Sequence, residues 1–247
     1  MSETTPPSAP PPAPAPEAEV GAIARIPGAL FFPTKTFASI ARRPTWLAPL
    51  ILWTIFSIVI TAVILPRVDY EKVIRASFER RGQTVPEERL QSIVESQKKI
   101  APKLYGAIAV VTPAFISLLV ALVFWGAFKA FGWDATFKQA FGATTHSFLP
   151  GILASVLLLP LILRQETVDP QNLGELLRSN LGFLVDSSSK VLHSLLQSID
   201  LFSFWSLALL VIGFSAAARV SRSSAAGVIL TIWFLFVLGK AGLAALF

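Results

Sequence analysis

Long uncharged apolar runs alternate with polar segments along the chain. A membrane-spanning helix needs about 20 consecutive apolar residues, and several of these runs reach or approach that length. A helix satisfies its backbone hydrogen bonds internally, so it is the form in which such a run crosses lipid. The pattern predicts an all-α, polytopic integral membrane bundle with about five spans, at residues 46–65, 105–128, 147–163, 201–218 and 225–246.

The third apolar run is the weakest of the five. It is barely long enough to cross a bilayer, it holds Pro150 and Pro160, and an amphipathic stretch from Phe137 to His146 precedes it. Two interpretations follow. Either this span begins earlier, inside the amphipathic stretch, or it is broken.

Two polar segments, residues 67–103 and 164–200, are patterned as amphipathic helices outside the bilayer. In the first, Asp69 is suited to cap one helix and Pro86 to open a second, which predicts a helical hairpin. In the second, several apolar residues share one face of a helix, and His193 is expected to face solvent on the opposite side. The apolar residues of that face are Val191, Leu192, Leu195, Leu196 and Ile199.

The chain before the first span divides into a tail and a helical stretch. Residues 1–27 are rich in Pro and Ala, and this composition predicts a disordered tail, with residues 28–247 as one membrane domain. From Ala29 to Arg43, Phe37 and Ile40 recur at helical spacing among basic residues. This pattern predicts a helix in the headgroup plane with its apolar face toward lipid. The alternative is an N-terminal extension of the first span.

Composition narrows the functional classes. Hydrophobic residues make up 53% of the 247 residues and charged residues 15%, so the apolar excess must be buried in lipid. The chain has no cysteine, which excludes disulfides, thiolate metal clusters and a thiol nucleophile. The net charge is +6, but the basic residues are spread over the links between runs. Anionic headgroups of the lipid bilayer are therefore the expected partner, and nucleic acid is not.

The distribution of basic residues also suggests an orientation. A short link after the fourth run carries Arg219 and Arg222 and no acid, whereas basic residues in the long polar segments are interleaved with acids. Cytoplasmic loops are enriched in Lys and Arg. The N-terminus is therefore predicted to be cytoplasmic.

Candidate chemistry is sparse. Neither His146 nor His193 has a partner at metal-ligand spacing, and phosphate loops, nucleophile elbows and paired intramembrane carboxylates are absent from the sequence. The sequence thus predicts neither an enzyme nor a cofactor or metal site. Lys240 lies inside the fifth run, where a charge is by default a functional candidate, although its side chain can snorkel toward the interface. His146 and Asp200 are boundary polar candidates.

The residues resemble the Yip-one (Ypt-interacting protein) domain family in its bacterial branch. The similarity lies in Pro33, Phe37, Ile40 and Pro44, in the polar hairpin, and in the final third, which contains Asp200, Phe202, Trp205 and Gly213 within IDLFSFWSLALLVIGFSAAARVSRSSAAGVILTIWFLF. It covers nearly everything after Pro27. The resemblance implies five spans, a cytoplasmic N-terminus and an extracytoplasmic C-terminus in a bacterial cytoplasmic membrane.

The resemblance does not carry over a known activity. Eukaryotic relatives are associated with Rab-type GTPases, but the acidic Leu-Tyr-Gly-Pro motif typical of them is missing here. Our hypothesis is a non-enzymatic protein that acts through lipid and protein contacts in membrane organisation or a trafficking-like role, with a second copy or another membrane protein as partner. The alternative is a small transporter or channel subunit that moves a solute or a lipid, for which Lys240 and the interrupted third run are the hints.

Overall fold

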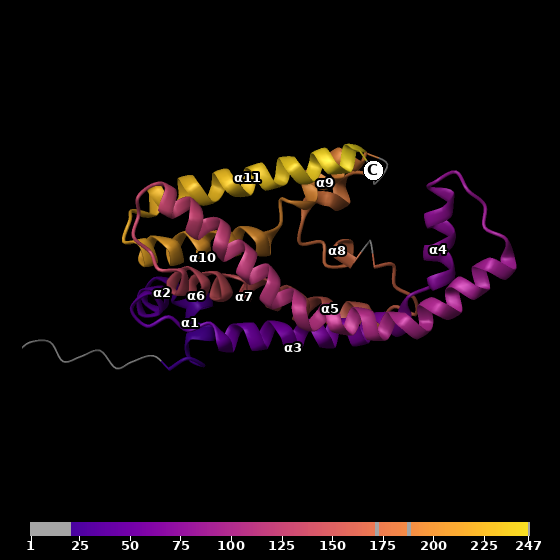
Figure 1. Cartoon of the computed structure of the whole chain (residues 1–247), viewed down its shortest axis with the longest axis horizontal. Coiled ribbons are helices and arrows are strands. Elements are labelled where there is room, and N and C mark those ends of the chain that lie inside the picture. The colour runs from indigo at the N-terminus through magenta and orange to yellow at the C-terminus, as the bar shows by residue number, and fades with distance from the viewer. Residues whose placement is uncertain (1–20, 171–172, 187–188, 247) are drawn as a thin grey trace, which may run out of the picture.

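Helices make up most of the described chain, which covers residues 21–170, 173–186 and 189–246 in this computed structural model (Figure 1). The predicted tail falls mostly on residues 1–20, outside the described residues. The α-helices are α1 (Arg25–Phe31), α2 (Pro33–Arg42), α3 (Leu47–Ile64), α4 (Tyr70–Glu79), α5 (Glu87–Ala130), α6 (Phe137–Ser147), α7 (Leu149–Leu163), α8 (Leu173–Leu176), α9 (Lys190–Gln197), α10 (Leu201–Ala218) and α11 (Arg222–Leu246), with 3-10 turns η1 (Leu65–Arg67) and η2 (Leu181–Leu184).

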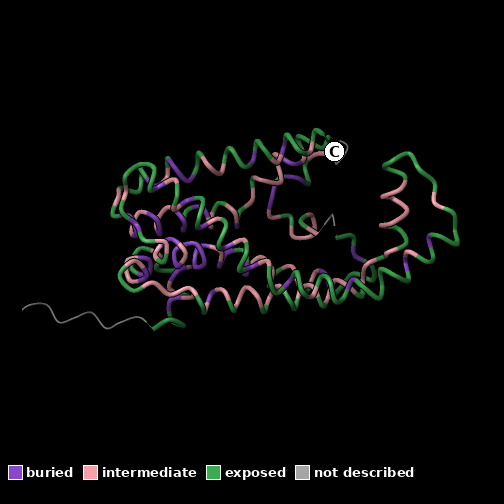
Figure 2. Tube along the Cα trace, viewed as in Figure 1, coloured by how far each residue is buried: buried purple, intermediate pink, exposed green. Residues whose placement is uncertain are grey.

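The core lies where α2, α5, α6, α10 and α11 meet, and buried residues gather at that end of the bundle (Figure 2). At its centre, Gly213 of α10 faces Phe37 of α2 and Ala143 of α6. A Cβ on Gly213 would lie 2.9 Å from Phe37 Cδ1 and 3.0 Å from Ala143 Cβ. A small residue at a helix contact allows close approach of the two backbones. Glycine at 213 therefore allows α10 to lie directly against both helices.

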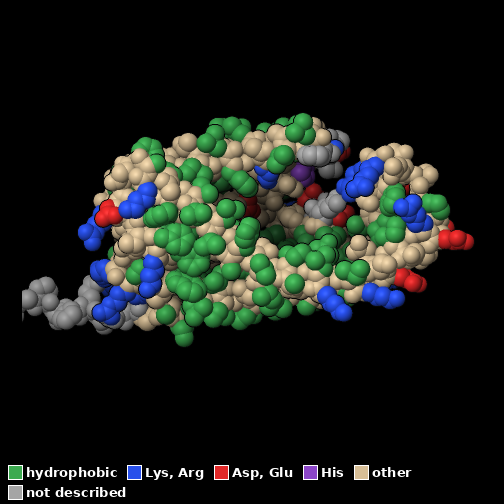
Figure 3. Space-filling model, in the orientation of Figure 1, with side chains coloured by type: hydrophobic (Ala, Val, Ile, Leu, Met, Phe, Trp, Pro, Cys, Tyr) green, Lys and Arg blue, Asp and Glu red, His purple; other side chains and the backbone are tan. Residues whose placement is uncertain are grey.

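Five stretches of the described chain are long and apolar enough to cross a membrane: α3 with η1, α5, α6 with α7, α10, and α11. In the space-filling view, hydrophobic side chains cover the middle of the visible face, and Lys and Arg lie mainly toward the two ends (Figure 3). Such a distribution suits a bilayer, because apolar atoms meet the acyl chains and basic groups meet the headgroups. The prediction of an all-α polytopic bundle is confirmed.

The helical stretch before the first span is placed differently from the prediction. It forms two helices, α1 and α2, and α1 begins at Arg25, inside the stretch assigned to the tail. Phe37 and Ile40 are each 1% exposed and pack in the protein core. The prediction that they face lipid is wrong. An amphipathic pattern shows that a helix has an apolar face but not whether lipid or protein covers it.

The hairpin after the first span is also only partly as predicted. Asp69 caps α4, its carboxylate accepting from the Lys72 N–H at 3.0 Å. The second arm, however, is not a separate helix. It is the first part of α5, which continues without a break through Pro102 and Pro113 to Ala130.

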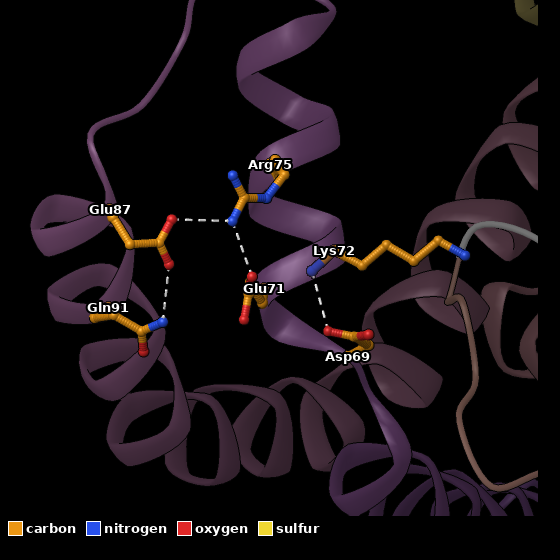
Figure 4. A network of polar contacts seen from close by, with 6 residues as sticks. All are labelled: Asp69, Glu71, Lys72, Arg75, Glu87 and Gln91. Atoms are coloured by element: carbon orange, nitrogen blue, oxygen red, sulfur yellow. Dashed lines mark hydrogen bonds and ion pairs between the residues drawn. The ribbon is translucent and has the colours of Figure 1, made fainter.

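Arg75 joins the two arms of the hairpin. Its guanidinium donates to Glu71 at 2.9 Å within α4 and to Glu87 at 3.2 Å at the start of α5 (Figure 4). The hydrogen bond to Glu71, followed by that to Glu87, raises the pKa of Arg75 above its usual value. Exposed ion pairs contribute little stability. Their effect here is to orient α4 against α5.

Both interpretations of the third span apply. The apolar stretch begins at Phe137 rather than at residue 147, and the helix is interrupted at Phe148, between α6 and α7. Thr136 and Gln139 form a capping box that starts α6. Pro150 lies in the first turn of α7, where its missing N–H is tolerated, and this explains a new helix start at that point.

Replacement of Phe37 by Ala tests the core. It removes a ring that contacts α10 and is expected to lower the free energy of unfolding in detergent by about 3 kcal/mol. Phe31→Ala, at a side chain that is 66% exposed, is the matched control and is expected to change it little. Equal losses for the two variants would contradict the placement of Phe37 in the core.

Candidate functional site

An apolar cavity of about 600 Å³ lies among α5, α7, α10 and α11. In the space-filling view the visible face is hollowed between α5 and the segment of α8 and α9, with acidic side chains and a histidine at the edge (Figure 3). Known ligand pockets have about 300–1,000 Å³. The lining is Ile116, Leu119, Val120, Val123, Phe124, Phe148, Gly151, Ala154, Asp200, Phe202, Ser203, Ser206, Leu207, Leu210, Ile232, Trp233 and Phe236.

Asp200 is the one sequence-predicted candidate that lines this cavity, and among the described lining residues it alone carries a charge. It is the N-cap of α10, where its Oδ1 accepts from the Ser203 N–H at 2.8 Å. The Ser179 hydroxyl donates to its Oδ2 at 2.5 Å. Both oxygens are thus held in place, so the carboxylate is fixed at the start of α10.

The segment before α10 is tied to the same carboxylate. Asn180 and Asp200 form an isolated antiparallel bridge, in which the Leu201 N–H donates to Ser179 O at 3.0 Å and the Leu181 N–H to Ile199 O at 3.2 Å. The bridge closes the loop that carries α9. Asp200 is therefore both a helix cap and the point at which an extramembrane segment joins the cavity.

His146 lies elsewhere, in the core. It is fully buried on α6, and its Nδ1 is 2.8 Å from Gly142 O. Within the part of the chain that the structure describes, neither His146 Nε2 nor Thr144 Oγ1 has a hydrogen-bond partner. Nδ1 therefore carries the proton that is donated to Gly142 O, and Nε2 is left as an acceptor.

Arg25 lies within electrostatic range of His146 and was missed by the sequence reasoning. It is only 4% exposed. Its guanidinium donates to Arg43 O at 2.7 Å, to Thr45 Oγ1 at 2.9 Å and to Ser39 Oγ at 2.9 Å. These bonds hold the start of α1 against the turn between α2 and α3. No sequence signal distinguished this arginine from the residues of the tail.

Lys240 does not belong to the cavity. It is partly exposed on α11 and forms no hydrogen bond or ion pair with any residue that the structure describes. His146, Asp200 and Lys240 are therefore not brought together into one site. The site that the structure presents is the apolar cavity with Asp200 at one end.

His193 faces inward, contrary to the prediction. Its side chain is 13% exposed, and its Nε2 is 3.5 Å from Glu175 Oε1 and 2.7 Å from Gln197 Nε2. Val191 and Leu192, on the predicted apolar face, are exposed. The sequence correctly grouped the apolar residues of α9 on one face. It is the opposite face, with His193, that contacts the rest of the protein.

The comparison with known families bears on the whole bundle. The Yip1 domain matches residues 28–243, which include the first four spans, most of the fifth, and Asp200. The chain belongs to the Yip1 domain family. The Yip1 match begins just before Ala29 and so includes most of α1, and it ends within α11. Neither a curated protein nor a solved structure matches the chain significantly.

Replacement of Asp200 tests its capping role in this Yip1 domain. Asp200→Ala removes the acceptor of the Ser203 N–H and of the Ser179 hydroxyl, and we expect the free energy of unfolding to fall by about 1–2 kcal/mol. Asp200→Asn keeps an acceptor oxygen and is expected to cost less. The free energies of unfolding of both variants, measured in the same detergent, give the difference between the two losses. Identical losses would argue against the cap.

Proposed function

We propose that this Yip1-family protein acts through lipid and protein contacts in membrane organisation and catalyses no reaction. In this proposal it lies in a bacterial cytoplasmic membrane with its N-terminus in the cytoplasm. The observation that carries the proposal is the apolar cavity among four of the spanning elements. The exposed apolar faces of α3, α5 and α11 would meet lipid or a second membrane protein.

The chemistry of the cavity favours an acyl chain as its occupant. If the cavity were empty, its lining would lose dispersion contacts, and water is a poor substitute because a buried water needs polar partners. The polar side chains of the lining are Asp200, Ser203 and Ser206, and both Asp200 oxygens are already engaged. An acyl chain contacts the apolar walls without needing a hydrogen bond.

A second candidate function rests on the interruption of the third span. Phe148, which separates α6 from α7, lines the cavity. Broken spanning helices beside a cavity are characteristic of transporters. Movement of a lipid or solute is therefore the alternative. Flux into proteoliposomes that is abolished by Lys240→Leu would favour it over a role in lipid contact alone.

The lipid-contact proposal predicts the effect of filling the cavity. A Cβ at Gly151 meets no atom within 4 Å, so Gly151→Phe can project into the cavity without displacing the backbone. We expect retention of lipid, measured by native mass spectrometry, to weaken about tenfold, since loss of two buried methylenes gives that factor.

The control is Gly227→Phe. It adds the same ring on α11 at an equally open glycine that does not line the cavity. If both variants retain lipid as the parent does, the proposed acyl-chain site is wrong.

The proposed orientation predicts which introduced thiols react with an impermeant reagent. Ala22, Ser92, Ser189 and Ser223 are exposed, and the chain has no native cysteine. In intact cells we expect labelling of Ser92→Cys and Ser189→Cys. Ala22→Cys and Ser223→Cys should react only after permeabilisation. Labelling of Ser92→Cys without Ser189→Cys would contradict five complete crossings.

A further inference from the structure

A second cavity, of about 490 Å³, lies between α3 and α5 where the first span ends. It is separate from the cavity with Asp200, because no residue lines both. Apolar residues of α3 and η1 form one wall, and Tyr70, Lys98 and Pro102 form the polar end and the opposite wall. The full lining is Ile58, Thr61, Ala62, Leu65, Pro66, Val68, Tyr70, Lys98, Pro102 and Gly106.

The depth of this cavity can be inferred from the helices around it. The first apolar stretch ends at Arg67, and the uncharged part of α5 begins at Tyr105. Lys98 precedes Tyr105 by about two helical turns, or about 10 Å. The headgroup layer is several Å thick, and a lysine side chain is long enough to reach back into it. The cavity therefore spans the boundary between acyl chains and headgroups.

Two aromatic residues also indicate that this cavity lies at the boundary between acyl chains and headgroups. The chain has two tyrosines, Tyr70 and Tyr105, and both lie at this end of the bundle. They interact electrostatically with each other. Tyrosine is enriched at membrane interfaces, where its ring meets acyl chains and its hydroxyl meets water and headgroups.

The polar end of the cavity offers donors that other protein groups do not occupy. Lys98 is exposed and forms no hydrogen bond or ion pair with another described residue. The Tyr70 hydroxyl has one long contact, 3.5 Å to Leu65 O, which is at the limit for a hydrogen bond. Burial, and then the neighbouring Tyr105, raises the pKa of Tyr70, so its hydroxyl keeps its proton at neutral pH.

Charge around the cavity favours an anion. Lys99 is exposed beside Lys98 on α5, and Arg67 lies at the end of η1. Asp69, next to Tyr70, already accepts from the Lys72 N–H, and Glu95 lies about one turn farther from the apolar part of α5 than Lys98. An apolar interior with a cationic end matches an amphiphile that has one anionic group next to an acyl chain.

We propose that this cavity binds an anionic phospholipid, with one acyl chain against α3 and the phosphate held by Lys98 and the Tyr70 hydroxyl. The inference rests on the proposed lipid-contact function and adds the class of lipid and the groups that recognise it. The hydrogen bonds of Arg75 to Glu71 and Glu87 then have a role in binding, since they hold α4, and with it Tyr70, beside α5.

The experiment compares phosphatidylglycerol with phosphatidylcholine on the full chain in a neutral detergent, titrated by native mass spectrometry. Lys98→Gln is expected to reduce the preference for phosphatidylglycerol about fivefold, the effect of one cation near an anionic headgroup. Lys103→Gln is the matched control, because it removes a nearby lysine of the same helix that does not line the cavity. An equal reduction by both variants would overturn the site in favour of diffuse attraction.

A second pair of variants tests the apolar part of the same site. Gly106 and Gly126 both lie in α5, and a Cβ at either meets no atom within 4 Å. Gly106 lines the cavity and Gly126 does not. Gly106→Leu is expected to weaken binding of phosphatidylglycerol about tenfold, and Gly126→Leu is expected to leave it unchanged. Unchanged binding in Gly106→Leu would overturn acyl-chain insertion.

Two further comparisons distinguish a failure of the site at Lys98 from a failure of the proposed lipid-contact function. Inorganic phosphate should not displace phosphatidylglycerol, because it leaves the apolar walls uncovered. Displacement would mean that the site binds phosphate alone and would overturn the proposal. If Lys98→Gln and Gly106→Leu have no effect while Gly151→Phe still reduces lipid retention, the site at Lys98 is wrong and the proposed lipid-contact function stands. If none of the three has an effect, both are wrong.

Discussion

The contact between Gly213 and Phe37 is the constraint on which the arrangement of the bundle depends. At this point α10 lies close enough to α2 and α6 that a single added carbon would have to displace Phe37 or Ala143. Lipid offers apolar helices no hydrophobic reason to associate, so close packing of this kind must supply much of the attraction. Once α10 is fixed there, its first turn and Asp200, 13 residues before Gly213, are fixed with it.

The close packing also explains the hydrogen bonds of Arg25 in the same region. The short helices α1 and α2 pack against the bundle, and the turn after α2 is partly buried beside Arg25. Arg25 supplies donors for Arg43 O and for two hydroxyls at this turn. A buried acceptor without a donor costs about 1–3 kcal/mol. The guanidinium therefore makes it feasible to cover this turn.

The sequence predicted the number and type of the spans because each is set by local composition. It did not predict where amphipathic faces point. Phe37 turned to protein instead of lipid, and His193 turned inward instead of outward, because both outcomes give the same periodic pattern. The continuity of α5 was missed because Pro86 and the polar run after it resemble an independent helix.

The candidate site was predictable only in part. Asp200 stood out as a polar residue at a boundary, and it does line the cavity. The cavity itself comes from residues on four elements that are distant in sequence, and no local pattern records their meeting. Arg25 and Lys98 have ordinary neighbours in the sequence, and only the surrounding helices give them a role.

The unbroken length of α5 gives the molecule a mechanical property. The 27 residues from Glu87 to Pro113 form an arm of about 40 Å, and Arg75 links α4 to its outer end. Pro102 and Pro113 each remove one backbone hydrogen bond without ending the helix, so bending is easiest at these two positions. A change of about 10° at Pro113 moves the far end by about 7 Å. Helices alter their tilt to match bilayer thickness, and a bend at Pro113 would carry such a change to the hairpin as a lateral displacement.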